Sequence, residues 1–340
     1  MTIRVAVNGF GRIGRNIVRA LYENNYQEKI TIVAINDLGD IESNAHLLKY
    51  DSVHGQFAEK ISYENSCLFV AEQAIHVFSE KDPLDLPWES LDIDIVFECT
   101  GKFTNKSSAE LHRKAGAKKV IISAPGNDVD ATIVYGVNEK CLTSSHAVIS
   151  NASCTTNCLA PIAKILDEHF SIESGLMTTI HAATNDQSIT DVYHTDPFRA
   201  RSAMLSMIPT KTGAAAAIGE VLPHLKGKFE GLAVRVPIAN VSLIDLTVSV
   251  KKETCIEDVN EIMKAASDNS VILDYNALPL VSCDFNHNSA SAIFDGNHTK
   301  VIGKQIKIMA WYDNEWGFSN RMLDNAIALM NSHYLGSTHV

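Results

Sequence analysis

The first 150 or so residues alternate short apolar runs with amphipathic stretches. Ile3–Val7 and Ile30–Ile35 are mostly apolar, as buried strands are, and the stretch from about Gly11 to Glu23 places apolar residues at helical spacing. The alternation continues with apolar runs at 93–99, 119–123 and 147–150 and a helical pattern at 107–115. Strands that alternate with helices predict a parallel sheet with right-handed crossovers. We expect the segment 48–90, with β-like runs at 68–70 and 75–78, to hold excursions from this sheet.

The pattern changes near Cys154. A helical stretch to about His169 is followed by a strand-like run, 175–181, and by a polar segment, 182–208, without a clear period. A helix at 213–222 and long alternating runs at 232–236, 241–250 and 306–312 come next. They predict a second domain in which an antiparallel sheet packs on helices. A final amphipathic stretch, about 319–332, is long enough for a helix that returns to the first domain.

Composition narrows the class of protein. The chain has 340 residues, more than one hydrophobic core usually serves, so two domains are expected. Its net charge of -11 argues against nucleic acid or an anionic membrane as the main partner. Met1 leads at once into a strand pattern, which leaves no room for a signal peptide, so we expect a cytoplasmic protein. Because the cytoplasm is reducing, we interpret its seven cysteines as free thiols.

A glycine-rich turn follows the first predicted strand. Gly9, Gly11 and Gly14 match G-x-G-x-x-G, with a strand before and a helix after, which lets a pyrophosphate approach the helix N-terminus. The motif alone is also compatible with a simple tight turn. Asp37 ends the second strand about 20 residues further on, where a carboxylate accepts from both ribose hydroxyls. The pair predicts dinucleotide binding, and the negative charge of Asp37 favours NAD over NADP.

A cysteine begins the first helix of the predicted second domain. We expect the partial positive charge at this N-terminus to lower the pKa of Cys154. A buried structural thiol is the commoner alternative, and a disulfide to Cys158 within one helix would be strained. No metal is expected, because C-x3-C lacks a matching second pair. Cys158 is interpreted as a small buried hydrophobe. His181, at the end of a predicted strand, is the candidate partner for a Cys–His pair, although such histidines are more often structural.

Potential anion donors cluster later in the chain. Guanidinium, hydroxyl and backbone groups that suit phosphate occur at Thr184, Arg199, Arg201, Thr212, Gly213 and Arg235. Arg199 and Arg201 lie in the segment without a period, and Thr212 and Gly213 open a predicted helix. From the pattern alone, a solvated loop with scattered arginines is the favoured alternative.

Ordered motifs from one end of the chain to the other carry a resemblance to a known family. They are NGFGRIGR (8–15), SAPG (123–126), SNASCTTNCLAP (150–161), TTIHAATNDQ (178–187), IPTKTGAA (208–215), RVPIANVSLIDL (235–246) and WYDNEWGFSNRM (311–322). ASCTTNC is highly specific. The chain resembles the phosphorylating glyceraldehyde-3-phosphate dehydrogenase family.

The resemblance implies an activity, the NAD-dependent oxidative phosphorylation of D-glyceraldehyde 3-phosphate to 1,3-bisphosphoglycerate in glycolysis or gluconeogenesis. It implies that Cys154 attacks the aldehyde to give a hemithioacetal. His181 raises thiol reactivity and takes the hydroxyl proton as hydride leaves for the nicotinamide. Inorganic phosphate then attacks the thioester.

The resemblance also assigns binding residues. It places the substrate phosphate at Thr184 and Arg235. The matches for the attacking phosphate are Ser153, Thr155, Arg199, Thr212 and Gly213. Cofactor contacts match at Gly9, Gly11, Arg12, Ile13, Gly14, Asp37, Lys81, Ser123 and Asn314, of which Asn314 orients the carboxamide.

The implied fold is α/β, with a Rossmann doubly wound parallel sheet and an α+β catalytic domain that has a mixed or antiparallel sheet. Residues 1–153 plus 319–340 form the implied NAD-binding domain, and 154–318 the catalytic domain. The implied assembly is a homotetramer in which the 182–208 loop lies near a neighbour's cofactor.

Four positions depart from the family pattern: Lys81 and Phe198 replace frequent arginines, and Ala183 and Phe318 replace frequent tyrosines. They bear on ligand affinity and loop packing more than on the reaction. The nearest alternative is erythrose-4-phosphate dehydrogenase, a relative that hydrolyses its thioester. Thr184-Asn185-Asp186 and Thr212-Gly213 favour the triose substrate instead. An alternative from another functional class is a regulatory or adhesion protein that binds NAD but has no catalytic activity. The presence of Cys154, His181 and Asn314 argues against this alternative.

Overall fold

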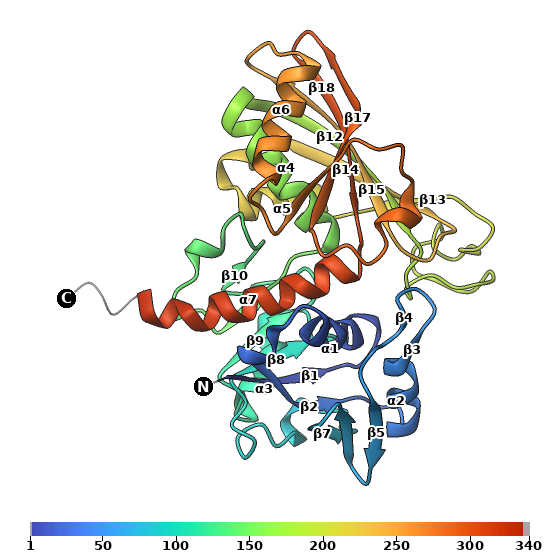
Figure 1. Ribbon diagram of the computed structural model, residues 1–340, viewed down its shortest axis with the longest axis vertical. Helices are drawn as coiled ribbons and strands as arrows, with labels where there is room; N and C mark the ends of the chain where they lie inside the picture. The colour runs from blue at the N-terminus through green and yellow to red at the C-terminus, as the bar shows by residue number, and fades with distance from the viewer. Residues whose placement is uncertain (1, 336–340) are drawn as a thin grey trace. The chain divides into compact units, whose positions relative to one another are not determined.

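The computed structural model describes residues 2–335 (Figure 1). Residues 1 and 336–340, which belong to the expected first domain, lie outside the described residues. Cys154–Phe318 form one compact unit, and the rest of the described chain forms the other. Within residues 2–335, no helix combines the length and the apolar character needed to cross a membrane.

The first unit is built on a nine-stranded sheet. Its parallel strands, in spatial order, are β10 (Ala131–Thr132), β11 (Val148–Ser150), β9 (Lys119–Ile122), β8 (Ile95–Glu98), β1 (Ile3–Asn8), β2 (Ile30–Asn36) and β7 (Gln73–Phe78). Two antiparallel strands, β6 (Cys67–Val70) and β5 (Ile61–Glu64), complete the edge. The predicted parallel sheet is therefore confirmed.

The prediction that segment 48–90 leaves the main sheet is only partly confirmed. Because β7 pairs with the free edge of β2, strands β5 to β7 extend the main sheet instead of leaving it. Only the ribbon of β3 (Tyr50–Asp51) and β4 (Gly55–Gln56) is separate from it.

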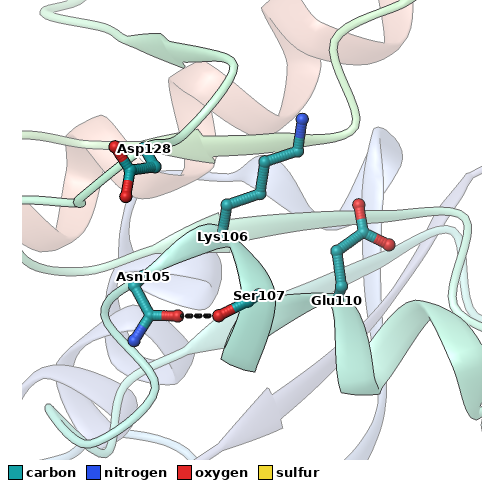
Figure 2. Close-up of a pocket in the computed structure, with 5 residues that line it drawn as sticks. All are labelled: Asn105, Lys106, Ser107, Glu110 and Asp128. Carbon is teal, nitrogen blue, oxygen red and sulfur yellow. Dashed lines mark hydrogen bonds between the residues drawn. The ribbon is translucent and has the colours of Figure 1, made fainter.

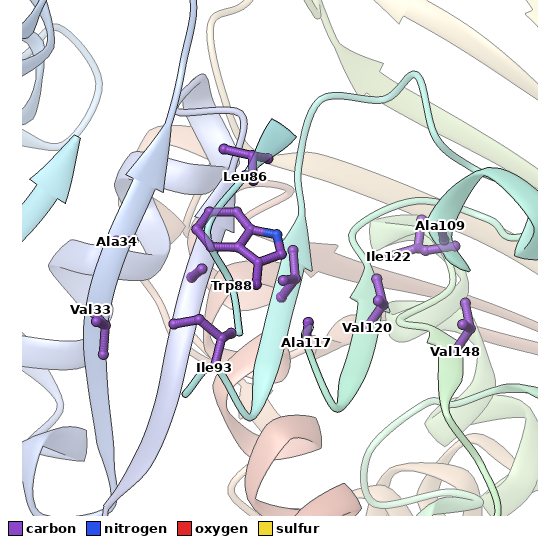
Figure 3. Close-up of a cluster of buried hydrophobic side chains, with 12 residues drawn as sticks. Val33, Ala34, Leu86, Trp88, Ile93, Ala109, Ala117, Val120, Ile122 and Val148 are labelled. Atoms are coloured by element: carbon purple, nitrogen blue, oxygen red, sulfur yellow. The ribbon is translucent and has the colours of Figure 1, made fainter. Parts of the chain in front are cut away.

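Both faces of this sheet are buried, which explains why its central strands are almost continuously apolar. The helices of the unit are α1 (Arg12–Glu23), α2 (Ile41–Lys49), α3 (Lys106–Lys114) and most of α7 (Trp316–Leu335). One buried cluster, shown in Figure 3, gathers Trp88 with aliphatic residues of the central strands and of α3. Burial of each large side chain of this kind contributes about 1.5–3 kcal/mol.

Helix α7 is tied to earlier parts of the same unit by side-chain hydrogen bonds. The Asn24 amide donates to Asn320 Oδ1 at 2.6 Å, and the Tyr26 hydroxyl donates to Asp324 at 2.8 Å. These contacts join the segment that follows α1 to α7 within one unit.

The second unit has a seven-stranded sheet. Its strands, in spatial order, are β13 (Ile208–Lys211), β14 (Phe229–Val236), β12 (Ile172–Ala182), β15 (Ser242–Val250), β18 (Gln305–Tyr312), β17 (Ala292–Ile302) and β16 (Leu273–Asn276). The pairs β12–β14 and β16–β17 are parallel and the others antiparallel, so the sheet is mixed.

Helices α4 (Cys154–Phe170), α5 (Ala214–Val221) and α6 (Ile256–Ser267) belong to this second unit and pack on the sheet. Alternate residues of β15 are buried, as expected for a strand with one covered face. All of segment 183–207 is described and contains no helix or strand, as predicted. Short 3₁₀ helices of the chain lie at Tyr26–Glu28, Pro83–Asp85, Glu139–Cys141, Pro223–Leu225 and Ser282–Phe285.

Candidate active site

The glycine turn between β1 and α1 is shaped by close backbone contacts. Gly9 has φ +92°, and a Cβ there would lie 2.7 Å from the Thr100 nitrogen. A Cβ on Gly14 would lie 2.3 Å from the Gly9 carbonyl oxygen. Gly11 is different, because a Cβ built on it meets no atom within 4 Å. No side chain caps the N-terminus of α1, so an open space beside Gly11 adjoins backbone donors suited to a phosphate.

Asp37 directly follows β2 and holds this turn. Its two carboxylate oxygens accept from the Phe10 and Gly39 nitrogens, each at 2.8 Å. The side chain is half-buried, and each oxygen keeps a further lone pair. Asp37 can therefore accept hydrogen bonds from a bound ribose while it fixes the turn.

The other predicted cofactor residues of this unit are placed differently. The Arg12 guanidinium is paired with Asp51, a contact that no local sequence pattern indicated, and Arg12 is the first residue of α1. Arg12 and the backbone donors of residues 53 and 54 hold the pKa of Asp51 well below its usual range, although burial opposes them. Ile13 follows Arg12 in α1, and Ser123 follows β9 with its nitrogen bonded to the Glu98 carbonyl at 3.0 Å. Lys81 is exposed after β7.

A buried polar network supports the turn. Trp88 Nε1 donates to His112 Nδ1 at 3.0 Å, so the ring proton of a neutral His112 lies on Nε2, 2.9 Å from Glu98 Oε2. The other oxygen of Glu98 accepts from the Thr100 nitrogen at 2.8 Å. Asn8 Nδ2 also donates to Glu98, at 2.6 Å. This network, which no local sequence pattern indicated, fixes the backbone of Thr100 against Gly9.

Two alanine substitutions separate folding from anion binding at this turn. Gly14→Ala places a methyl group against the Gly9 carbonyl, so we expect a loss of about 2–4 kcal/mol of stability together with weak NAD binding. Gly11→Ala meets no protein atom and should leave the melting temperature unchanged while NAD binding weakens about tenfold. Thermal melts and NAD titrations of both variants check this. Unchanged NAD affinity in Gly11→Ala would contradict the interpretation of the open space.

The second unit brings the predicted cysteine and histidine together. Cys154 is the first residue of α4 and His181 lies near the end of β12, with 3.5 Å between Cys154 Sγ and His181 Nε2. Cys158, one turn along, is fully buried, and its sulfur lies 4.0 Å from the Trp311 carbonyl oxygen. The histidine thus faces Cys154, and Cys158 packs in the core as predicted.

Arg235 lies directly beside His181 on the neighbouring strand, because β12 and β14 pair in parallel with these two residues in register. Arg235 Nη1 lies 2.5 Å from His181 Nδ1 and 3.1 Å from the Ala182 carbonyl oxygen. That carbonyl is also 2.8 Å from Nδ1. Burial, followed by the Arg235 charge, lowers the pKa of His181 to about 3. His181 is therefore a neutral imidazole at physiological pH.

The expected lowering of the cysteine pKa is wrong. Burial raises the pKa of Cys154 and outweighs the opposite effects of the Arg235 charge and of hydrogen bonds at Thr155. The helix start therefore does not by itself produce a thiolate. A neutral thiol beside a neutral imidazole is a pair in which Nε2 can take the proton as sulfur attacks.

The hydroxyl of Tyr312 joins two threonines beneath this pair. It lies 2.9 Å from Thr155 Oγ1 and 2.8 Å from Thr179 Oγ1, and burial raises its pKa far above the usual value. The ring packs edge-on against His181 with centroids 6.0 Å apart. Thr155, predicted to bind phosphate, thus has its hydroxyl in a buried network and its backbone nitrogen at the start of α4. Tyr312 and Thr179 were missed as separate site residues, although both lie within the family motifs.

Arg199 and Arg201, two of the predicted anion donors, differ in their surroundings. Arg199 interacts electrostatically with both His181 and Arg235, so its positive charge belongs to the same region. In this structure its guanidinium is held by Asp186 and by Thr210, whose Oγ1 accepts from Nε at 3.0 Å. Arg201 is instead exposed and paired with Asp191.

The remaining donors lie at the ends of elements. Thr184 follows β12, where its nitrogen donates to Gln187 Oε1 at 3.3 Å. Thr212 accepts from the Ala214 nitrogen at 3.2 Å, and Gly213 is the N-cap of α5. Ser153 is half-buried and directly precedes Cys154 in the chain.

Asn314 lies two residues beyond the end of β18 and is buried. Its Oδ1 accepts from the Ser242 hydroxyl at 2.8 Å. Ser242 was not singled out from the sequence, although it lies within the RVPIANVSLIDL motif.

A hollow of about 640 Å³ in the first unit is lined by none of the predicted site residues. Its lining comes from the start of α3 and from Asp128, and Figure 2 shows Ser107 bonded to Asn105 at its edge. Lys106, which also lines it, is paired with Asp130 at 2.6 Å. Among the lining residues, Asn105 caps the N-terminus of α3 by accepting from the Ser108 nitrogen at 2.9 Å.

Comparison with known proteins agrees with this geometry. Residues 3–106 match the NAD-binding domain of glyceraldehyde 3-phosphate dehydrogenase, and residues 153–314 match its C-terminal domain. A glyceraldehyde-3-phosphate dehydrogenase of Pseudomonas aeruginosa is 61% identical over 97% of this chain and 98% of its own length. The plasmid and chromosomal enzymes of that name from Cupriavidus necator are each 58% identical over 98% of this chain and 100% of their own length. The chain belongs to the glyceraldehyde-3-phosphate dehydrogenase family and is an NAD-dependent oxidoreductase.

Proposed function

We propose that this enzyme oxidises and phosphorylates D-glyceraldehyde 3-phosphate to 1,3-bisphosphoglycerate with NAD. The observation that carries the proposal is the pairing of Cys154 Sγ with His181 Nε2 at 3.5 Å beside the Arg235 guanidinium. A thiol, a neutral base and a fixed positive charge suit covalent oxidation of a phosphorylated aldehyde.

The first unit fits NAD on its own geometry. A cradle beside Gly11 that a Cβ would occupy adjoins the uncapped start of α1, and the Asp37 carboxylate flanks the same turn. We assign the cofactor to Gly9, Gly11, Gly14, the backbone of Arg12 and Ile13, Asp37, Lys81 and Ser123, with Asn314 for the carboxamide. When bound, NAD accepts the hydride that leaves the substrate carbon.

Cys154 and His181 carry the covalent steps. The sulfur bonds to the aldehyde carbon, and the thiol proton passes through His181 Nε2 to the aldehyde oxygen, which gives a hemithioacetal. His181 then takes the hydroxyl proton as the carbon is oxidised to a thioester. A phosphate oxygen attacks that carbonyl carbon, the C–S bond breaks, and sulfur regains a proton. The product is an acyl phosphate.

The anion donors divide between the two phosphates. We assign the substrate phosphate to Thr184 and Arg235. We assign the attacking phosphate to Ser153, Thr155, Arg199, Thr212 and Gly213. Arg199 must exchange Asp186 for its anion, and Thr155 contributes its backbone nitrogen while its hydroxyl stays with Tyr312. Gly213 has open space beside its Cα, as a backbone contact to phosphate requires.

The wider organisation follows the same proposal. We assign NAD binding to residues 1–153 plus 319–340 and catalysis to 154–318. A homotetramer is supported by apolar side chains on the 182–208 loop that are exposed in the single chain, such as Tyr193 at 89% and Leu205 at 88%. In the tetramer this loop would lie near a neighbour's cofactor. All seven cysteines are free, which supports a cytoplasmic location.

The test is NADH formation from two aldehydes, with and without inorganic phosphate. We expect glyceraldehyde 3-phosphate to be the better substrate, with a rate that depends on phosphate. Faster, phosphate-independent oxidation of erythrose 4-phosphate would indicate the hydrolytic relative instead. NAD binding without turnover of either aldehyde would indicate a regulatory or adhesion protein that has no catalytic activity.

A further inference from the structure

Ser242, the first residue of β15, connects two strand ends of the second unit. Its side chain is 1% exposed. Ser242 Oγ accepts from the Ala182 nitrogen at 3.1 Å and donates to Asn314 Oδ1 at 2.8 Å. One hydroxyl group therefore joins the end of β12, which carries His181, to the segment after β18.

These two bonds determine which way the Asn314 amide faces. The Ala182 nitrogen has no acceptor capacity, so the single hydroxyl proton goes to Asn314, whose oxygen must point toward Ser242. Nδ2, on the other side of the amide, then points away from Ser242. A flipped amide would leave the buried hydroxyl proton without an acceptor, which is unfavourable.

We propose that Ser242 is a positioning residue that makes Asn314 present an N–H donor, rather than a carbonyl acceptor, to the carboxamide oxygen of NAD. The inference rests on the proposed contact between Asn314 and the cofactor. It adds that cofactor recognition depends on a serine that touches no ligand. The same serine fixes Ala182, whose carbonyl oxygen contacts Arg235 and lies near His181 Nδ1.

The test compares binding of NAD with binding of its thionicotinamide analogue, whose C=S group is the poorer acceptor. Calorimetry on the full-length protein should show that wild type prefers NAD. In Ser242→Ala we expect NAD binding to weaken about tenfold while analogue binding changes little, because the amide loses its fixed orientation. The preference should then largely disappear. Ser242→Thr, which keeps the hydroxyl, should restore it.

A matched control distinguishes orientation from general loss of a buried hydroxyl. Thr299, 2% exposed in the same unit, donates to Asn260 Oδ1 at 2.6 Å. Thr299→Val removes an equivalent bond and should leave the preference for NAD intact. Equal loss of preference in both variants, or an unchanged preference in Ser242→Ala, would overturn the inference.

Asn314 variants separate this inference from the proposed function. Asn314→Asp retains an oxygen for Ser242 but offers no N–H donor, so it should lose the preference even if Ser242→Ala fails to fold. Retained preference in Asn314→Asp would also overturn the inference. If Asn314→Ala leaves NAD affinity unchanged, the proposed cofactor contact itself is wrong. If only the Asn314 variants lose the preference for NAD, the contact between Asn314 and the cofactor is supported, and the positioning role of Ser242 is contradicted.

Discussion

Cys154→Ser should lower kcat/KM by about 10⁵-fold, since the reaction passes through a covalent bond to this sulfur and serine is a far weaker nucleophile beside a neutral imidazole. Serine has nearly the same shape, so the melting temperature and NAD affinity should stay close to wild type. NADH formation measured spectrophotometrically, together with a melt and an NAD titration, checks all three quantities.

Cys158 provides the control in the same helix. Cys158→Ala removes a buried sulfur that packs near Trp311, so it should cost about 1–2 kcal/mol of stability while kcat/KM stays within a few-fold of wild type. Iodoacetamide that modifies Cys154 stoichiometrically should also abolish activity. If kcat/KM of Cys154→Ser were within tenfold of the wild-type value, the thioester mechanism would be contradicted.

His181→Gln should lower kcat by about 10³-fold, because the variant retains hydrogen-bonding capacity but has no base to accept the thiol and hydroxyl protons. Substrate affinity should change much less than kcat. Steady-state rates at saturating NAD and phosphate measure the two effects separately. A variant with kcat near wild type would show that another group takes these protons.

The same variant has a distinct signature in its stability. Burial and then Arg235 lower the folded-state pKa of His181 to about 3 from a usual value of 6.5. Between these values the unfolded chain binds more protons at this residue than the folded chain does, so the His181 contribution to stability falls as pH drops from about 6.5 toward 3. Urea unfolding at pH 7.5 and pH 5 should therefore show a smaller acid-induced loss in His181→Gln than in wild type. An equal or larger loss would contradict the neutral buried state.

Elements with a strong period could be predicted from the sequence. The glycine turn, β1, β2, α4 and β12 lie close to their expected positions because each has a clear apolar pattern bounded by glycine or polar residues. α2 was missed, although Asp40 caps it through Ser43, because only three of its residues are buried. β17 was missed because Asp295 and Gly296 interrupt its apolar pattern.

The site could be predicted only where a motif carried it. Cys154 and His181 were identified correctly as partners, but the parallel pairing that sets Arg235 beside His181 links strands separated by a long connection and leaves no local signal. The cysteine pKa was mispredicted for a related reason. A helix start is visible in the sequence, whereas the burial that outweighs it is a property of the assembled unit.

The return of α7 to the first unit has a consequence for synthesis of the chain. Residues up to Ser153 are synthesised before the second unit, yet Asn24, Tyr26 and Asn151 bond with side chains in the part of α7 that follows the second unit in the sequence. The second unit is continuous in sequence and can complete its hydrogen bonds earlier. The first unit therefore cannot complete these hydrogen bonds until α7 has been synthesised, which happens only after the whole second unit has been made.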